Sequence, residues 1–191
     1  MRTSNESKPR GIIVFGPNGS GKTTLGRELA HILNFKHIDV EDYCFIESEI
    51  PYTVTRSRED SINMMLADIE RHGSFVISTV KGDWGNTIPQ FYELAVHISA
   101  PHELRMERVK NRVYEQHGER ICEGGDMYEQ EQKFFDFVAS SPPAKIEQWA
   151  ETLTCPIIHI DGTEDWRMNA VVIAKRFLCM GGDMQGNPEV R

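Results

Sequence analysis

The sequence predicts an α/β fold in which one parallel β-sheet lies between two layers of helices, as a three-layer αβα sandwich. Two observations predict this class. Short apolar runs of strand-like composition alternate along the chain with longer helix-like segments, which is typical of parallel sheets with helical crossovers. The chain also has 191 residues, of which 39% are hydrophobic and 26% charged, and this suits one globular domain with a full core.

Five apolar runs are expected to form the strands of the sheet. The clearest is the β-branched run Ile12-Ile13-Val14-Phe15. The predicted strands span residues 11–15, 36–39, 74–78, 94–98 and 156–160. Because parallel sheets bind their ligands at the carboxyl ends of the strands, the functional site is expected there.

The segments between these runs carry helix signals. Helices are expected at 21–34, from about 58 to 72, at about 101–117, after Asp126, after Ser141 and at 165–179. Ser57-Arg58-Glu59-Asp60 has the form of a capping box for the second of these, and 50–53 is expected to be loop. Residues 1–10 are predicted to be a disordered N-terminus and 181–191 a flexible tail, which leaves 11–180 as a single domain.

Composition argues against several classes of protein. A net charge of −8 makes long nucleic acid an unfavourable partner. No apolar run reaches the length of a membrane span, and the polar start of the chain lacks the apolar core of a signal peptide. Four cysteines lie far apart without C-x-x-C spacing, which indicates reduced thiols in a cytoplasmic protein.

The stretch between the first predicted strand and the first predicted helix carries the strongest functional signal. It reads Gly16-Pro17-Asn18-Gly19-Ser20-Gly21-Lys22-Thr23 and fits the pattern G-x-x-x-x-G-K-S/T. Glycines let backbone N–H groups point at a phosphate chain, and the helix start adds unpaired donors. The pattern therefore predicts that this stretch and Thr24 bind ATP with Mg²⁺, with Lys22 on the β- and γ-phosphates and Thr23 on the metal.

Acidic side chains follow the second predicted strand, in Asp39-Val40-Glu41-Asp42. A carboxylate at this edge of the sheet could accept a proton from a reacting hydroxyl or hold a metal-bound water. We interpret Asp39 as the general base or as a metal-side ligand beside Thr23, and Asp42 as a substrate contact. The alternative, a solvated acidic turn that caps a helix, stays open for Glu41 and Asp42.

The loop after the third predicted strand is expected to line an acceptor pocket. Gly82 allows close approach, Lys81 supplies charge and Trp84 a flat apolar wall, while Asp83 is a second candidate for base or metal ligand. The alternative is a surface turn with an aromatic plug. Arg56 is a further candidate for binding an anionic acceptor.

Three arginines, Arg105, Arg108 and Arg112, are spaced three and four residues apart and therefore share one face of the predicted helix. Arginines on a mobile lid can neutralise the charge that develops during phosphoryl transfer while they exclude water. We predict that Arg108 and Arg112 act in catalysis together with Lys22 and Asp39. A solvated helix face that pairs with neighbouring glutamates is the alternative.

These motifs resemble those of the small P-loop kinases of the adenylate, shikimate and gluconate kinase group. The strong part of the resemblance is Gly16 to Thr23. Weaker parts are Asp39-Val40-Glu41 in place of a D-x-D motif, the 76–85 segment in place of a glycine-rich acceptor loop, and Ser99-Ala100-Pro101 before the arginines. The chain is also similar to a bacterial branch of this group that carries only the label of a P-loop or shikimate-kinase-like ATPase.

The resemblance implies a P-loop NTPase fold with sheet order 2-3-1-4-5, a lid near 112–126, and Mg-ATP as phosphoryl donor. It also implies that Asp161-Gly162-Thr163 lies near the adenine. Two departures narrow the acceptor. Val80-Lys81 replaces the Gly-Gly of shikimate kinases, and the G-x-P-R stretch of nucleoside monophosphate kinases is absent after Ser78.

The sequence thus predicts an ATP- and Mg²⁺-dependent phosphotransferase that acts on a hydroxyl or phosphate of a small molecule. Two alternatives stay open: a nucleotide-binding regulatory ATPase without an acceptor, and a kinase of nucleosides or RNA ends. The choice between ATP and GTP, and between a monomer and a homodimer, also stays open.

Overall fold

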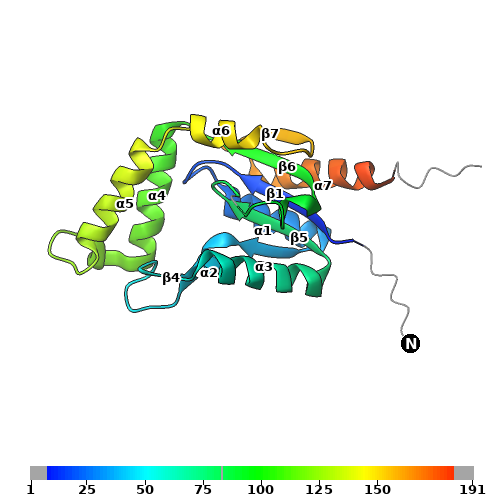
Figure 1. Ribbon diagram of the computed structural model, residues 1–191. Helices are drawn as coiled ribbons and strands as arrows, with labels where there is room; N and C mark the ends of the chain where they lie inside the picture. The colour runs from blue at the N-terminus through cyan, green and yellow to red at the C-terminus, as the bar shows by residue number, and fades with distance from the viewer. Residues whose placement is uncertain (1–7, 83, 183–191) are drawn as a thin grey trace, which may run out of the picture.

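The computed structural model describes residues 8–82 and 84–182, and its centre is a five-stranded parallel sheet (Figure 1). The strands are β1 (Arg10–Phe15), β2 (Lys36–Asp39), β5 (Ser74–Thr79), β6 (Tyr92–Ser99) and β7 (Ile157–Asp161). They lie in the order β2-β5-β1-β6-β7, with all neighbours parallel. Counted along the chain within this sheet, the order is the expected 2-3-1-4-5.

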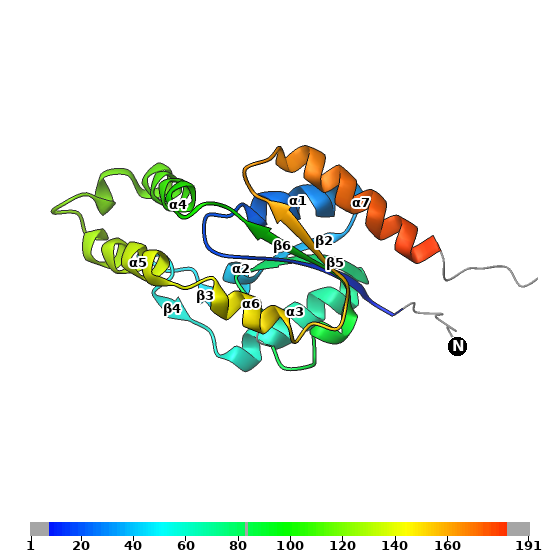
Figure 2. The same ribbon diagram turned by 90° about the horizontal axis from the view of Figure 1, so that it is seen from above.

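Two layers of helices cover the sheet, as Figure 2 shows from above. One face carries α1 (Lys22–Leu33) and α7 (Trp166–Gly182), whose side chains form a core cluster around Leu25, Leu29 and Phe177. The other face carries α2 (Val40–Cys44), α3 (Arg58–His72) and α6 (Ala144–Ala150), in a second cluster that includes Phe15 and Met65. The predicted three-layer α/β class is confirmed.

The ends of the predicted domain need correction where the structure describes them. β1 begins at Arg10, inside the stretch predicted to be disordered, because the Arg10 guanidinium pairs with Glu93 at 2.7 Å on the neighbouring strand β6. At the other end, α7 continues to Gly182, three residues beyond the predicted helix. The rest of the predicted termini, 1–7 and 183–191, lies outside the described residues. Within the described residues, no helix combines the length and the apolar character needed to cross a bilayer.

A helical arm, defined here as residues 102–140, extends away from the sheet (Figures 1 and 2). It consists of α4 (His102–His117), the 3-10 turn η2 (Gly118–Ile121) and α5 (Tyr128–Ser140). The arm has its own apolar cluster, formed by Val109, Val113, Ile121, Met127, Phe135 and Val138. Asp126 does not cap α5 as expected, since its carboxylate instead pairs with the guanidinium of Arg120 at 2.8 Å.

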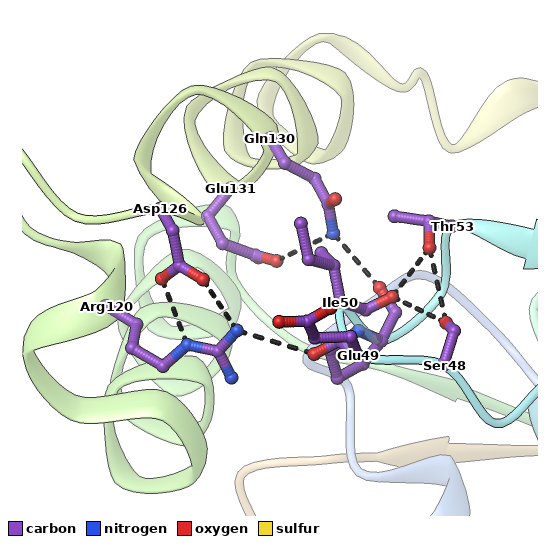
Figure 3. A network of polar contacts seen from close by, with 9 residues as sticks. Ser48, Glu49, Ile50, Thr53, Arg120, Asp126, Gln130 and Glu131 are labelled. Carbon is purple, nitrogen blue, oxygen red and sulfur yellow. Dashed lines mark hydrogen bonds and ion pairs between the residues drawn. The ribbon is translucent and has the colours of Figure 1, made fainter.

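A small antiparallel sheet, absent from the sequence prediction, links the main sheet to the arm. Its strands β3 (Phe45–Ile46) and β4 (Val54–Thr55) are two residues long, and each has too few residues to show a pattern. The loop between them, residues 47–53, packs Ile50 against the apolar cluster of the arm. Figure 3 shows the polar contacts that accompany it: the Arg120 guanidinium donates to the Glu49 carbonyl at 3.4 Å, and Gln130 lies beside the same loop.

Candidate functional site

The glycine-rich stretch forms a tight loop between β1 and α1, at the carboxyl edge of the sheet. Gly19 and Gly21 adopt φ angles of 79° and 104°, which side chains with a Cβ rarely adopt. Gly21 precedes the first turn of α1, so the backbone N–H groups of that turn face the loop. The Lys22 ammonium donates to the carbonyl of Pro17 at 3.0 Å and so closes the loop on itself.

The loop carries a polar side chain that suits a phosphate chain. The hydroxyl of Ser20 is buried, and among the described residues it has no hydrogen-bond partner. Ser20 also lines a cavity beside the loop, so a ligand there is within reach of the loop's polar groups. The residues that the sequence assigned to the nucleotide phosphates therefore fit such a group.

Arg105 supports the loop from the base of the arm. Its side chain is only 4% exposed, and its guanidinium donates to the carbonyls of Ala100 at 3.1 Å and Asn18 at 3.2 Å. Arg108, one turn further along α4, donates to the carbonyl of Gly19 at 3.4 Å. The three arginines thus do not form one solvated stripe: the first two hold the backbone of the phosphate loop.

Lys22 is the electrostatic centre of the site. Burial lowers the pKa of its ammonium to about 8, while the charges of Glu41 and Asp39 raise that pKa and the charges of Arg112 and Arg105 lower it. These four side chains therefore lie within electrostatic range of Lys22, although they come from α2, β2 and α4. A bound anion would stabilise the protonated ammonium at this position, because its negative charge offsets the burial that lowers the pKa.

The three acidic candidates lie in different surroundings. Asp39 ends β2 and caps α2, with its side chain only 13% exposed and 4.0 Å from the Arg27 guanidinium. Glu41 is exposed at the surface but lines a cavity toward the arm, where partial burial and the nearby charge of Asp39 raise the pKa of its carboxyl. Asp42 is exposed outside that cavity, and its carbonyl accepts a hydrogen bond from Arg56.

A polar relay that the sequence did not reveal holds the start of α1. The hydroxyl of Ser78 donates to the carbonyl of Lys22 at 3.2 Å, and its oxygen lies 3.0 Å from Nε2 of His37. Burial lowers the pKa of His37 to about 4, so its ring is neutral at pH 7. The relay joins β2, β5 and α1 and fixes Lys22 in the loop. No motif marks it, because it depends on strand pairing.

Two cavities are lined by residues of the candidate site. The first, of about 240 Å³, is lined by loop residues and by Thr24, Arg108, Gly162 and Trp166. Gly162 of the Asp161-Gly162-Thr163 turn lines it, and the position of a nucleotide base near this turn stays a prediction. A backbone hydrogen bond from the Gly162 N–H to the Ser99 carbonyl, at 2.6 Å, ties the turn to the end of β6.

The second cavity, called here the arm cavity, has a volume of about 250 Å³ and lies between α2, the 47–53 loop and the arm. Glu41 and Arg112 line it on the side toward Lys22. Three aromatic side chains, Phe45, Tyr52 and Phe134, also line it. Sequence reasoning missed all three, because they lie in separate segments that carry no recognisable motif.

The loop after β5 lines neither the first cavity nor the arm cavity. The prediction that this loop forms a wall of an acceptor pocket is therefore corrected. Trp84 packs against the core cluster and borders a separate depression near α3. The carbonyl of Gly82 accepts a hydrogen bond from the Trp149 indole at 2.9 Å, and Lys81 is exposed. Asp83 lies outside the described residues.

Arg56 is not among the residues that line the arm cavity, although it contacts the backbone of Phe45, which is. Its guanidinium donates to the carbonyls of Asp42, Tyr43 and Phe45, the last at 2.6 Å, and so covers the end of α2. Among the described residues, no group of three or more His, Cys, Asp or Glu side chains is arranged to hold a metal ion. The assignment of Thr23 and Asp39 to Mg²⁺ stays a prediction.

Comparison with known proteins places the chain in a family. A family model described as an AAA domain (AAA_18) matches residues 12–134. The chain is 24% identical over 160 residues to the uncharacterized protein YqaC of Bacillus subtilis, covering 80% of this chain and 88% of that protein. It is 28% identical over 141 residues to a cytidylate kinase of Haloarcula marismortui, covering 66% of this chain and 71% of that protein.

Solved structures share the fold at low identity. A shikimate kinase from Bacteroides thetaiotaomicron superposes with a TM-score of 0.53 at 19% identity, covering 88% of this chain and 98% of that one. A gluconokinase from Sinorhizobium meliloti does so with a TM-score of 0.50 at 18% identity, covering 94% and 98%. The chain therefore belongs to the AAA domain family and has the fold of the P-loop small-molecule kinases.

Proposed function

We propose that the chain is a Mg²⁺-dependent kinase that transfers the γ-phosphate of ATP to a small-molecule acceptor. The observation that carries this proposal is the position of Lys22. It closes a loop that borders the first cavity, and it lies within electrostatic range of Glu41 and Arg112, which line the arm cavity. A site that only binds a nucleotide needs the first cavity alone.

The residues divide into two sets in this proposal. Residues 16–24 bind the phosphates, with Thr23 and Asp39 on the side of the Mg²⁺ ion, which would neutralise phosphate charge when bound. Lys22 and Arg112 stabilise the negative charge that develops on the transferred group. Arg108 stabilises the phosphate loop through its hydrogen bond to the Gly19 carbonyl, and it lines the first cavity, which this proposal assigns to the nucleotide.

Glu41 is the general base in this proposal, and Asp39 takes the metal-side role. A carboxyl group with a raised pKa accepts a proton more readily than an ordinary one, and Glu41 faces the arm cavity. The acceptor hydroxyl oxygen forms a bond to the γ-phosphorus, the bond to the oxygen that bridges the β- and γ-phosphates breaks, and the hydroxyl proton passes to Glu41. We further propose that residues 112–126 of the arm act as a lid over this step.

The test is ATP consumption at millimolar Mg²⁺ with panels of nucleosides, nucleotides, sugar acids and aminoglycosides. One acceptor class should raise ADP release well above the rate without acceptor. Lys22→Met should lower that rate roughly 100-fold or more, as loss of a preorganised charge contact does. Lys145→Met is the matched control, because it removes an exposed lysine of α6 that lines neither cavity. ADP release that no acceptor stimulates would favour the regulatory ATPase instead.

A further inference from the structure

The chemistry of the arm cavity restricts the acceptor, and this inference rests on the proposed function. Phe45 and Tyr52 meet edge to face with ring centroids 5.2 Å apart, and Phe134 lines the same cavity from α5. Aromatic walls bind flat, unsaturated rings more favourably than polyhydroxylated chains, because ring faces stack. At about 250 Å³ the cavity is slightly below the roughly 300–1,000 Å³ of ordinary ligand pockets, so the acceptor is small.

Tyr52 is held in this wall at an energetic cost. Its φ angle is 63°, in the left-handed region that costs a residue with a Cβ roughly 1–2 kcal/mol. The hydroxyls of Ser48 and Thr53 both donate to the Ile50 carbonyl, at 2.7 and 2.6 Å, and so fix the loop around Tyr52 (Figure 3). Strained residues that surrounding contacts hold in place are typical of binding sites.

A buried carboxylate supplies the polar part of the cavity. Glu131 is only 5% exposed, and the Gln130 amide lies 3.4 Å from its Oε1 (Figure 3). The same amide nitrogen donates to the Pro51 carbonyl at 3.1 Å, which places Gln130 between Glu131 and the loop of Tyr52. Among the described residues no Lys or Arg forms an ion pair with Glu131. The oxygens of the Glu131 carboxyl group can accept hydrogen bonds, so Glu131 suits a ligand that offers N–H donors.

The charges in the lining disfavour anionic acceptors. Glu41 and Glu131 contribute two carboxylates, and Arg112 contributes one guanidinium. The proposed function already uses Arg112 for the transferred phosphate, which leaves no other lysine or arginine in the lining to bind a phosphate or carboxylate of the acceptor. The imidazole of His117 is the remaining basic group of the lining, and it stands against the two carboxylates. Nucleoside monophosphates and sugar acids would each bring a negative charge toward Glu41 and Glu131.

We propose that the acceptor of the arm cavity is an uncharged nucleoside, with its base between Tyr52 and Phe134, base N–H groups on Glu131, and a sugar hydroxyl toward Glu41. The aromatic wall matches the flat ring of a nucleoside base, and the buried carboxylate matches its N–H donors. The net negative lining accounts for the absence of a phosphate on the acceptor. The reacting hydroxyl lies on the side of the cavity that faces Lys22.

The experiment uses the full chain and two independent measurements. Calorimetric titrations with cytidine, thymidine, adenosine and guanosine measure binding in the presence of Mg²⁺ and a non-hydrolysable ATP analogue. ADP release with the same nucleosides, their 5′-monophosphates, gluconate and kanamycin measures transfer. We expect at least one nucleoside to bind and to stimulate ADP release at least 10-fold more than its monophosphate, gluconate or kanamycin.

Variants connect the result to the cavity. Tyr52→Leu should weaken nucleoside binding about 5- to 150-fold, which corresponds to roughly 1–3 kcal/mol of base stacking. Glu131→Gln should weaken it at least 10-fold, and both variants should keep the KM for ATP. Tyr114→Leu makes the same substitution at an exposed tyrosine of α4 outside the cavity, and it should change neither value.

The outcomes separate this inference from the proposed function. Stimulation by gluconate, kanamycin or a monophosphate, without binding of any nucleoside, would overturn the inference and leave the kinase proposal intact. Nucleoside binding that Tyr52→Leu weakens, with no acceptor-stimulated ADP release, would support a nucleoside site in the arm cavity but overturn the kinase proposal, and with it the role of the nucleoside as acceptor. Nucleoside binding that neither Tyr52→Leu nor Glu131→Gln changes would overturn the assignment to this cavity.

Discussion

Gly19 provides the sharpest structural test of how the arm and the phosphate loop depend on each other. Its φ angle is 79°, and a Cβ atom added there would collide with the backbone of Arg105 at the base of α4. Backbone cannot move aside as the end of a flexible side chain can. Gly19→Ala must therefore displace either the loop or the start of the arm.

The expected magnitude has two parts. The left-handed backbone costs alanine roughly 1–2 kcal/mol. Displacement also lengthens the bonds from Arg105 to the Asn18 carbonyl and from Arg108 to the Gly19 carbonyl, now 3.2 and 3.4 Å, and a hydrogen bond from a charged group contributes about 1.5–3 kcal/mol. If about one such bond is lost, Gly19→Ala lowers the free energy of unfolding by roughly 3–5 kcal/mol.

Gly124→Ala separates the two parts. Gly124 has a similar φ angle of 87°, but a Cβ atom there meets nothing within 4 Å, so this variant carries only the backbone strain. Urea denaturation should show a loss of about 1–2 kcal/mol for Gly124→Ala and a clearly larger loss for Gly19→Ala. Calorimetry should show weaker ATP binding for Gly19→Ala alone. Equal losses of stability in the two variants would refute the coupling between the loop and the arm.

Two further predictions concern protonation. At pH 8 to 9 the phosphates of ATP are already ionised, so a proton taken up when ATP binds reports on the protein. The bound anion should raise the Lys22 pKa from about 8, so the wild type should take up close to half a proton or more and Lys22→Met none. Calorimetry in buffers of different ionisation enthalpy measures this uptake, and equal uptake in both proteins would argue against the assignment. If Glu41 is the base, activity should fall as the pH decreases through its raised pKa, because a base acts only when ionised. Glu41→Gln should lower kcat about 10²- to 10⁴-fold and remove this fall on the acidic side of the pH–rate profile. A variant whose profile keeps the fall would exclude Glu41 as the base.

The parts of the fold that depend on local sequence could be predicted well. The spacing of glycines, lysine and threonine from Gly16 to Thr23 is enough to predict a phosphate-binding loop. The strand before it and the helix after it are predicted by the hydrophobic pattern of the adjacent residues. The Ser57 cap of α3 was also predicted, and the structure shows its hydroxyl accepting the Asp60 N–H at 3.0 Å. The sheet order followed from the resemblance to small kinases, because local patterns do not determine which strands pair.

The candidate site was predicted less completely, for physical reasons. Helical spacing put three arginines on one face of α4, but it could not tell that Arg105 would be buried under the phosphate loop. A tryptophan near glycines suits an acceptor wall or a core plug equally, and packing against the core decided this for Trp84. Tyr52 and Glu131 line one cavity only because the 47–53 loop docks on the arm, through contacts such as that between Pro51 and Gln130, about 80 positions apart.

Transfer of a labelled γ-phosphate tests the central claim most directly. The full chain is incubated with Mg²⁺, γ-³²P-labelled ATP and the acceptor panel, and the products are separated. The account predicts that label appears on a small-molecule acceptor, and that Lys22→Met abolishes this transfer while Lys145→Met retains it. Label that appears only as free phosphate, in both the presence and the absence of every acceptor, would contradict the account.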